Sequence, residues 1–197
     1  MENIVIKKLT PELAEEYARF HDEVPYKEQG KEDVHCYCVT WRNDETYKGD
    51  DHWYPTKEER RERAVRFVKD GKMQGYLAYS GGKIVGWCNA TADCKGGVDF
   101  LRSTFPIAEH DAGVKVKSIF CFLIAHDMQR RGIATKLTER ICEDAAADGF
   151  DFAEAYVDKN ASDSVHDYRG PLAMYEKCGF EITAEREGKL VMRKALK

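Results

Sequence analysis

The sequence predicts a mixed α/β structure in which helices flank a central β-sheet, and three observations carry this prediction. Ile119–Ala125 is apolar and rich in β-branched and aromatic residues, as a buried strand would be. Within Tyr76–Trp87, Gly81 and Gly82 provide the positive φ angles that a hairpin turn needs. A helix is expected after the apolar strand, because apolar residues recur every four positions: Ile133, Leu137, Ile141 and Ala145.

The other elements are predicted from local signals. Asn3–Leu9 alternates as a short strand, and Thr10-Pro11 opens a helix that runs to Phe20. A capping box at Thr56–Glu59 begins a helix that ends near Lys69. The remaining segments are an irregular, aromatic stretch at Asp22–Pro55 in which only Val34–Trp41 resembles a strand, a loop with at most one helical turn at Cys94–Ala112, a strand at Phe152–Val157, a helix from Pro171, and two strands that meet at Glu187-Gly188.

Composition favours one domain over residues 1–197 and excludes several classes of protein. The chain has 22.6 kDa, a net charge of −4 and no apolar run approaching the ~20 residues that span a bilayer. The N-terminus lacks the features of a signal peptide, and the odd count of seven cysteines argues against a disulfide framework, so we expect a cytoplasmic protein. The charge cluster Glu58–Arg63 mixes signs, which argues against nucleic-acid binding.

The turn Gln129–Ala134 joins the apolar strand to its helix and predicts an anion site. Free N–H groups at a helix start carry partial positive charge, and Arg130 and Arg131 add to it. A phosphate group fits such a site. The ATP-binding P-loop and the dinucleotide fingerprint are both missing from the sequence.

Gln129, Gly132 and Ala134 match Gln/Arg-x-x-Gly-x-Gly/Ala, so this turn resembles the pyrophosphate loop of the GNAT-superfamily N-acetyltransferases. Ala173–Phe180 is similar to the closing motif of that family, and Tyr76–Trp87 is similar to its hairpin. Cys36, Cys38 and Trp41 also resemble the Cys-x-Cys-x-x-Trp segment of a bacterial subgroup of that family. The resemblance to the family implies a GNAT fold, with a mixed central sheet splayed at the coenzyme site and flanking helices.

The resemblance also implies acetyl-CoA as co-substrate, with backbone groups of the central strand along the pantetheine arm and the loop around the pyrophosphate. Asn160 corresponds to a coenzyme contact, although the loop after the Phe152–Val157 strand is longer than the family's. The implied coenzyme residues are Phe122, Leu123, Ile124, Gln129, Arg130, Arg131, Gly132, Ile133, Ala134, Thr135 and Asn160.

Two residues are candidates for catalysis. The resemblance gives Tyr175 the position of a general acid beside the coenzyme sulfur, the alternative being a tyrosine that only packs. Glu154 lies in an apolar strand, where a carboxylate is costly unless it is paired or functional, so it is a candidate general base. The family's usual glutamate would fall at Ala155, and the alternative for Glu154 is the exposed face of the strand.

Tyr37, Trp41 and Trp53 are the candidate acceptor-binding residues, because aromatic walls suit apolar or cationic ligands. Alternatively, these rings only cover the open end of the sheet. Cys36 and Cys38 would face opposite sides of a strand and lack a second ligand pair, so we expect no metal.

Taken with the resemblance, these residues predict an acyl-CoA N-acyltransferase that moves an acetyl group to a primary amine of a small molecule or peptide. The alternative is a non-catalytic protein that binds or senses acetyl-CoA. No nucleic acid or membrane partner is expected, and a homodimer is left open.

Overall fold

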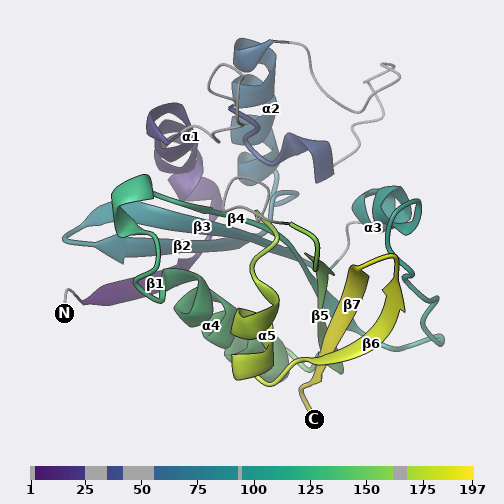
Figure 1. Cartoon of the computed structure of the whole chain (residues 1–197). Coiled ribbons are helices and arrows are strands. Elements are labelled where there is room, and N and C mark those ends of the chain that lie inside the picture. Colours follow the sequence, from purple (N-terminus) through teal and green to yellow (C-terminus); the bar gives the residue numbers. More distant parts are fainter. Residues whose placement is uncertain (1–2, 25–34, 42–55, 93–94, 162–167) are drawn as a thin grey trace.

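The computed structural model describes residues 3–24, 35–41, 56–92, 95–161 and 168–197. Its centre is a seven-stranded sheet in the order β1-β2-β3-β4-β5-β7-β6 (Figure 1). β4 and β5 are parallel, and every other neighbouring pair is antiparallel, which confirms the mixed sheet. The strands are β1 (Ile4–Lys8), β2 (Gly75–Ser80), β3 (Lys83–Thr91), β4 (Val116–Ile124), β5 (Phe152–Asp158), β6 (Glu181–Arg186) and β7 (Lys189–Ala195).

Helices cover both faces of the sheet and enclose two groups of buried side chains. One group packs Tyr17 and Phe67 onto the sheet, and the other packs Leu137 and Tyr175 onto the opposite face. The helices are α1 (Ala14–Glu23), α2 (Lys57–Lys69) and α3 (Lys95–Arg102) on the first face, and α4 (Ile133–Ala147) and α5 (Leu172–Lys177) on the second (Figure 1). Three short 3₁₀ turns accompany them, at Pro11–Leu13, Val39–Trp41 and His126–Met128.

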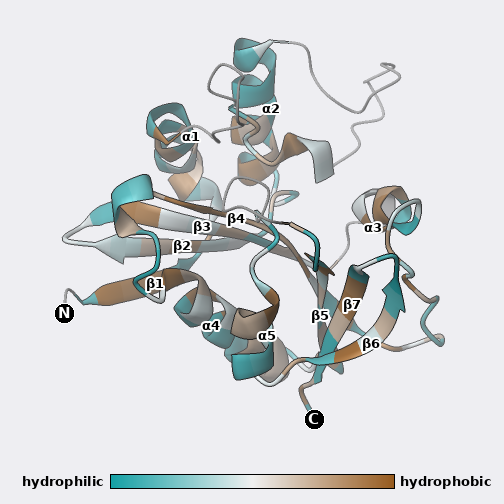
Figure 2. Cartoon of the chain, in the orientation of Figure 1, coloured by the Kyte–Doolittle hydropathy of each residue, from teal (hydrophilic) through white to brown (hydrophobic). Residues whose placement is uncertain are grey.

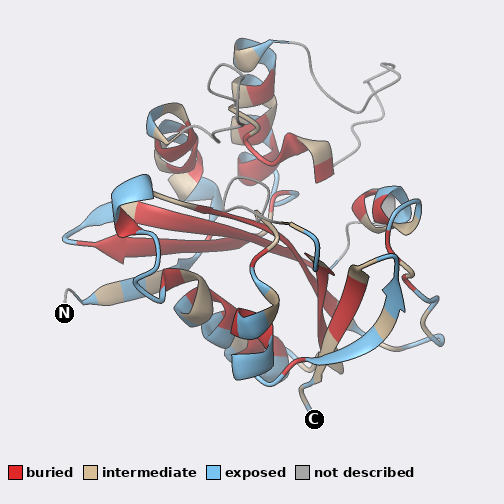
Figure 3. Ribbon diagram, viewed as in Figure 1, coloured by how far each residue is buried: buried red, intermediate tan, exposed pale blue. Residues whose placement is uncertain are grey.

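The central strands are buried from both sides. Every residue of β2 is buried, and β3 and β4 are buried over most of their length (Figure 3). The outward surface of α2 is hydrophilic, whereas much of the central sheet is hydrophobic (Figure 2). In the described part of the chain, every helix is too short or too polar to cross a bilayer.

Local signals in the sequence are confirmed where they set helix ends and turns. The Thr56 side chain accepts the Glu59 amide at 3.1 Å, and the Glu59 carboxylate accepts the Thr56 amide at 3.2 Å, which completes the capping box. Gly81 and Gly82 adopt φ of 55° and 80° in the β2–β3 turn. These turns depend on neighbours in the sequence, and so they could be predicted.

The strand expected at Val34–Trp41 is wrong. Tyr37 and Cys38 form a turn with φ of 48° and 53°, and Val39–Trp41 is a 3₁₀ turn. Val34 itself lies outside the described residues. Both Cys38 and Val39 are buried. The apolar pattern therefore reflects packing under α1 and α2, and not pairing in the sheet.

The prediction of a loop with at most one helical turn at Cys94–Ala112 is also corrected, because this segment contains the eight-residue helix α3. Leu101 anchors this helix in the buried group under α1 and α2, and an ion pair between Arg102 and Asp99 joins adjacent turns at 2.7 Å. The first helix likewise extends to Glu23, three residues beyond its expected end.

β4 and β5 separate halfway along their length. Their last paired residues are Ile119 and Ala155, yet β4 stays paired with β3 as far as Ile124. β5 continues to Asp158 in its pairing with β7. A register shift opposite Asn89 and Ala90 leaves Phe120 unpaired at the point of divergence, as a β-bulge does. The central sheet is thus splayed, as expected, and this gap between the strands positions the candidate site.

Candidate active site

The loop between β4 and α4 lies at the end of the gap and presents unpaired backbone amides. Lys136 donates the first helical hydrogen bond to the Gly132 carbonyl at 3.0 Å, so the preceding amides have no partner within the helix. Gly132 caps the helix at φ 77°, and Arg130 adopts φ 59°, which is uncommon for a residue with a side chain. A Cβ on Gly132 would meet nothing within 4 Å, so the backbone angle is what favours glycine there.

This loop is electropositive and firmly placed. The side chains of Gln129, Arg130 and Arg131 are exposed, whereas Ile133 is buried. A Cβ on Gly86 would lie 2.8 Å from the Ile124 side chain and 3.0 Å from that of Ile133, so β3, β4 and α4 approach closely here. Ala134 and Thr135, half-buried, complete the first turn. The arrangement can hold an anion through amides, helix dipole and arginines.

Two of the three predicted backbone groups on β4 face the gap. The Ala125 amide donates to Val85 of β3 at 3.0 Å. Because successive amides along a strand point to opposite sides, Leu123 also faces β3, where it pairs with Trp87. Phe122 and Ile124 therefore face away from β3. The Phe122 amide donates to the Tyr168 carbonyl at 2.6 Å.

Tyr175 lies close to Phe122. Its ring is fully buried, 5.2 Å from the Phe180 ring centre and 6.5 Å from that of Phe122. Its hydroxyl donates to the Arg169 carbonyl at 2.7 Å. Tyr175 thus fits both interpretations drawn from the sequence, the packing residue and the general acid. Its ring packs in the core, while its hydroxyl points toward the segment that lies along the gap.

That segment, Tyr168–Gly170, was not singled out from the sequence. Its two successive carbonyls accept from the Phe122 amide and the Tyr175 hydroxyl. Gly170 has φ 86°, and a Cβ there would lie 2.9 Å from Met174 and 3.1 Å from Phe122, so only glycine fits. The Gly-Pro pair before α5 was the available signal, since it marks a turn close to other backbone or side chains.

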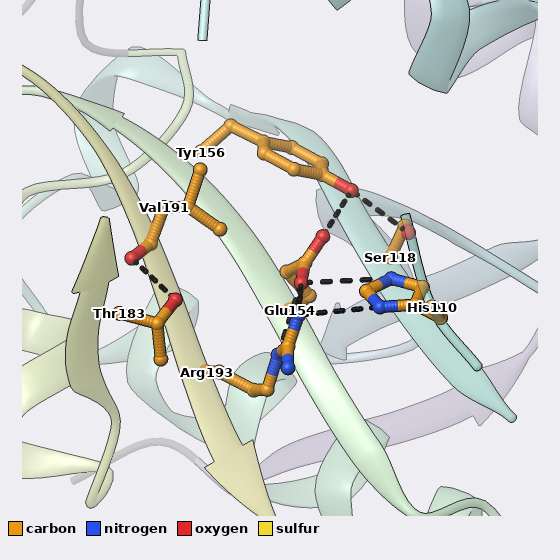
Figure 4. A network of polar contacts seen from close by, with 7 residues as sticks. All are labelled: His110, Ser118, Glu154, Tyr156, Thr183, Val191 and Arg193. Atoms are coloured by element: carbon orange, nitrogen blue, oxygen red, sulfur yellow. Dashed lines mark hydrogen bonds and ion pairs between the residues drawn. The ribbon is translucent and has the colours of Figure 1, made fainter. Parts of the chain in front are cut away.

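Glu154 is buried, with 1% of its surface exposed, and it is paired (Figure 4). Arg193 donates to one carboxylate oxygen from Nε at 3.1 Å and from Nη2 at 2.6 Å, and Tyr156 donates to the other at 3.0 Å. His110 lies 3.8 Å away, and Ser118 is 3.0 Å from the Tyr156 hydroxyl. The exposed-face alternative is therefore wrong.

Glu154 lies far from the gap along the strand direction. It lies opposite Ser118 in the sheet, four residues before Phe122, or about 13 Å along β4 at ~3.3 Å per residue. Tyr156 stands between them, with its ring 5.8 Å from that of Phe120. Burial, and then the negative charge of Glu154, raises the pKa of Tyr156 well above its ordinary value.

Asn160 lies at the far end of β5, against the β6–β7 turn. Its side-chain amide donates to the Glu187 carbonyl at 3.3 Å, and its backbone amide donates to Asp158 at 3.1 Å. A Cβ on Gly188 would collide with the Asn160 amide at 2.3 Å. Asn160 thus packs onto this turn.

The candidate acceptor residues lie in different surroundings. Tyr37 is buried between α1 and α2 and donates to Asp22, and burial raises the pKa of its hydroxyl. Trp41 is 7% exposed and lies 5.3 Å from the Phe120 ring, beside the gap. Trp53 lies outside the described residues.

The cysteine segment differs from the expected alternation. The Cys38 sulfur lies 2.9 Å from that of Cys121 and accepts from Trp87 Nε1 at 3.2 Å, and the Cys36 thiol reaches the same sulfur. The two thiols therefore meet, because they lie in a turn. Among the described residues, no cluster of three or more His, Cys, Asp or Glu could hold a metal ion.

Comparison with known proteins agrees with this geometry. The model of the acetyltransferase (GNAT) family matches residues 35–180. An acetyltransferase of the GNAT family from Streptococcus pneumoniae is similar over 99% of this chain and 100% of its own (19% identity, TM-score 0.53). The GNAT domain of S. lividans PAT is similar over 98% and 96% (16% identity, TM-score 0.57). The NatC complex bound to Gag peptide and CoA is similar over 100% of both chains (16% identity, TM-score 0.55).

At these identities the solved structures show a common fold. No curated protein matches the chain. The family match covers well over half of the sequence and confirms the resemblance inferred from the pyrophosphate loop. The chain therefore belongs to the GNAT family of acetyltransferases, and it is an acyltransferase.

Proposed function

We propose that residues 1–197 form one acetyltransferase domain that transfers the acetyl group of acetyl-CoA to a primary amine of a small molecule or peptide. The carrying observation is the β4–β5 gap, which has the Phe122 amide at its edge and the electropositive Gln129–Gly132 loop at its end. A pantetheine arm has amides that can pair with a free strand edge. A pyrophosphate needs the unpaired N–H groups and arginines of the loop.

In the proposed reaction, a neutral amine attacks the thioester carbonyl carbon, a C–N bond forms and the C–S bond breaks. The Phe122 amide stabilises the negative charge that develops on the carbonyl oxygen. Tyr175 gives its proton to the departing thiolate, and a base takes the proton that the amine loses. The products are an N-acetylated amine and free coenzyme A.

Glu154 is the proposed base, acting through water because its carboxylate lies too far from Phe122 for direct contact. The Tyr156 hydroxyl joins Glu154 to Ser118, which lies at the same level of the sheet. The competing role for Glu154 is to hold Arg193 and so join β5 to β7. Asn160 would contact the coenzyme only after leaving the Glu187 carbonyl.

For the acceptor, we propose Tyr37, Trp41 and Trp53 as binding residues. Replacing Trp41 or Trp53 by alanine should raise the acceptor KM and leave acetyl-CoA binding unchanged. A wild-type KM in both folded variants would place the acceptor elsewhere. A peptide acceptor is compatible with the similarity to a complex that holds one.

Release of free thiol from acetyl-CoA, followed across a panel of primary amines, tests the proposed function directly. Amine-dependent release and a mass gain on the amine support it. Tight binding of acetyl-CoA without amine-dependent release from any member of the panel would instead favour the sensing alternative. The same screen identifies the acceptor.

A further inference from the structure

The guanidinium of Arg169 is surrounded by aromatic rings from three parts of the chain. Its Cζ lies 5.3 Å from the ring centre of Trp41, 4.9 Å from that of Phe105 and 4.9 Å from that of Tyr168. Ring faces at these distances attract a cation. Trp41 and Phe105, here called the ring pair, are both buried and belong to the group under α1 and α2. The ring pair is therefore a fixed wall on the face that carries Trp41 and Tyr156.

Arg169 is an imperfect occupant of this position. Nη2 donates to the Tyr168 hydroxyl at 2.9 Å, but Nη1 is buried and has no hydrogen-bond partner in the described structure. A buried N–H of a charged group that lacks a partner is costly. The aromatic rings around Arg169 therefore stabilise its positive charge, but they do not satisfy all of its N–H groups.

The backbone of Arg169 is held by the two groups that the proposed function assigns to acetyl-CoA. The Tyr168 carbonyl accepts from Phe122, the proposed oxyanion donor, and the Arg169 carbonyl accepts from Tyr175, the proposed acid. A thioester carbonyl and a thiolate would need the same two donors. Binding of acetyl-CoA must then release Tyr168–Gly170 from the gap, and Arg169 moves with this segment.

We propose that the ring pair binds a cationic group of the acceptor, and that Arg169 fills this place until acetyl-CoA displaces Tyr168–Gly170. The inference rests on the proposed function, which it deepens by naming the substrate class. The attacking amine must be neutral, so the cation at the ring pair is a second group. The acceptor is thus an amine that also carries a guanidinium or ammonium group, as an arginine- or lysine-containing compound does.

Calorimetry with two matched probes tests this inference without turnover. L-arginine amide carries a guanidinium, and L-citrulline amide replaces it with a neutral urea of nearly the same shape. Arg169→Ala should bind arginine amide about tenfold more tightly than wild type, the gain expected from one desolvated cation–π site. It should show no gain for citrulline amide. Arg169→Lys keeps the cation in place and should behave as wild type.

Trp41→Leu in the Arg169→Ala background should abolish the gain for arginine amide. Saturating coenzyme A added to wild type should reproduce part of the gain, because it releases the segment. Equal gains for both probes would mean that the substitution merely opens space, and that result overturns the inference, as does no gain at all. Arg169→Gln replaces Arg169→Ala if the latter fails to fold. Because binding is measured, absence of acetyl transfer would overturn only the proposed function.

Discussion

The Phe122 amide and the Tyr168 carbonyl are joined by a 2.6 Å hydrogen bond across the gap where β5 has left β4. The free edge of β4 is therefore satisfied by a segment of the same chain. A buried amide without such a partner would be costly. In the proposed complex this contact competes with acetyl-CoA, and the affinity for the coenzyme then includes the free energy of displacing Tyr168 from Phe122.

Gly132→Glu should weaken acetyl-CoA binding by at least ~2 kcal/mol, or roughly 30-fold, because it adds a negative charge where the pyrophosphate would meet the amides. Gly149→Glu is the matched control. It lies at the other end of α4 with a similar φ of 75° and open space around it. Calorimetry that finds equal affinity for both variants would remove the loop from coenzyme binding.

Tyr175→Phe should lower kcat by about 10²–10⁴-fold with little change in coenzyme affinity, the usual effect of losing a general acid. The phenyl ring keeps its packing on Phe180. Steady-state kinetics give kcat, and calorimetry gives the affinity. Wild-type turnover in this variant would leave Tyr175 as a packing residue.

Glu154→Gln separates the two roles of that carboxylate. As the proposed base it should flatten the alkaline rise of the pH–rate profile. As the partner of Arg193 it should lower the free energy of unfolding by about 3 kcal/mol, because a largely buried charge is left unpaired. Urea unfolding measures the second effect. A destabilised variant with an unchanged pH profile would make Glu154 a structural residue.

His21 should make stability depend on pH. It is buried, and this burial lowers its pKa to about 3 in the folded protein. In the unfolded chain His21 binds a proton near pH 6.5, whereas in the folded chain it stays neutral down to about pH 3. The free energy of unfolding therefore decreases as pH falls from 6.5 toward 3, by about 1.4 kcal/mol per pH unit. Urea unfolding at pH 7.5 and pH 5 should show a smaller loss in His21→Gln. An equal loss in both proteins would contradict this assignment.

Protein purified without chelators should contain no stoichiometric zinc or iron. The Cys38 thiol meets those of Cys36 and Cys121, and in the part of the chain that the structure describes no group of three or more His, Cys, Asp or Glu is arranged to hold a metal ion. Elemental analysis checks this expectation. A metal equivalent that disappears in a Cys36→Ser, Cys38→Ser double variant would overturn it.

The sequence predicted those features that depend on near neighbours. The Gln129–Gly132 loop needs only a strand, a residue with positive φ and a helix, and all three have local signatures. The packing at Val39–Trp41 has no such signature, because it is set by contacts with α2, α3 and β4. Burial of a short apolar segment by tertiary contacts looks like strand periodicity in the sequence.

The partners of the candidate residues could not be predicted in the same way. Arg193 reaches Glu154 through the register of β5 with β7, across 39 positions of sequence. Tyr168 reaches Phe122 only because two strands diverge. Both contacts follow from the assembled sheet, and periodicity within a single segment carries no information on them.

The buried thiols have a consequence for chemical selectivity. Cys88 pairs with Phe122 in the sheet, so β4 separates its thiol from the gap in which the thioester is proposed to lie. Burial raises the pKa of both Cys88 and Cys38 well above the ordinary value, so these sulfurs stay protonated at neutral pH. Exchange with a thioester needs a thiolate. The protonation of these sulfurs and their place outside the gap both favour transfer of the acyl group to the amine over its transfer to a cysteine of the protein.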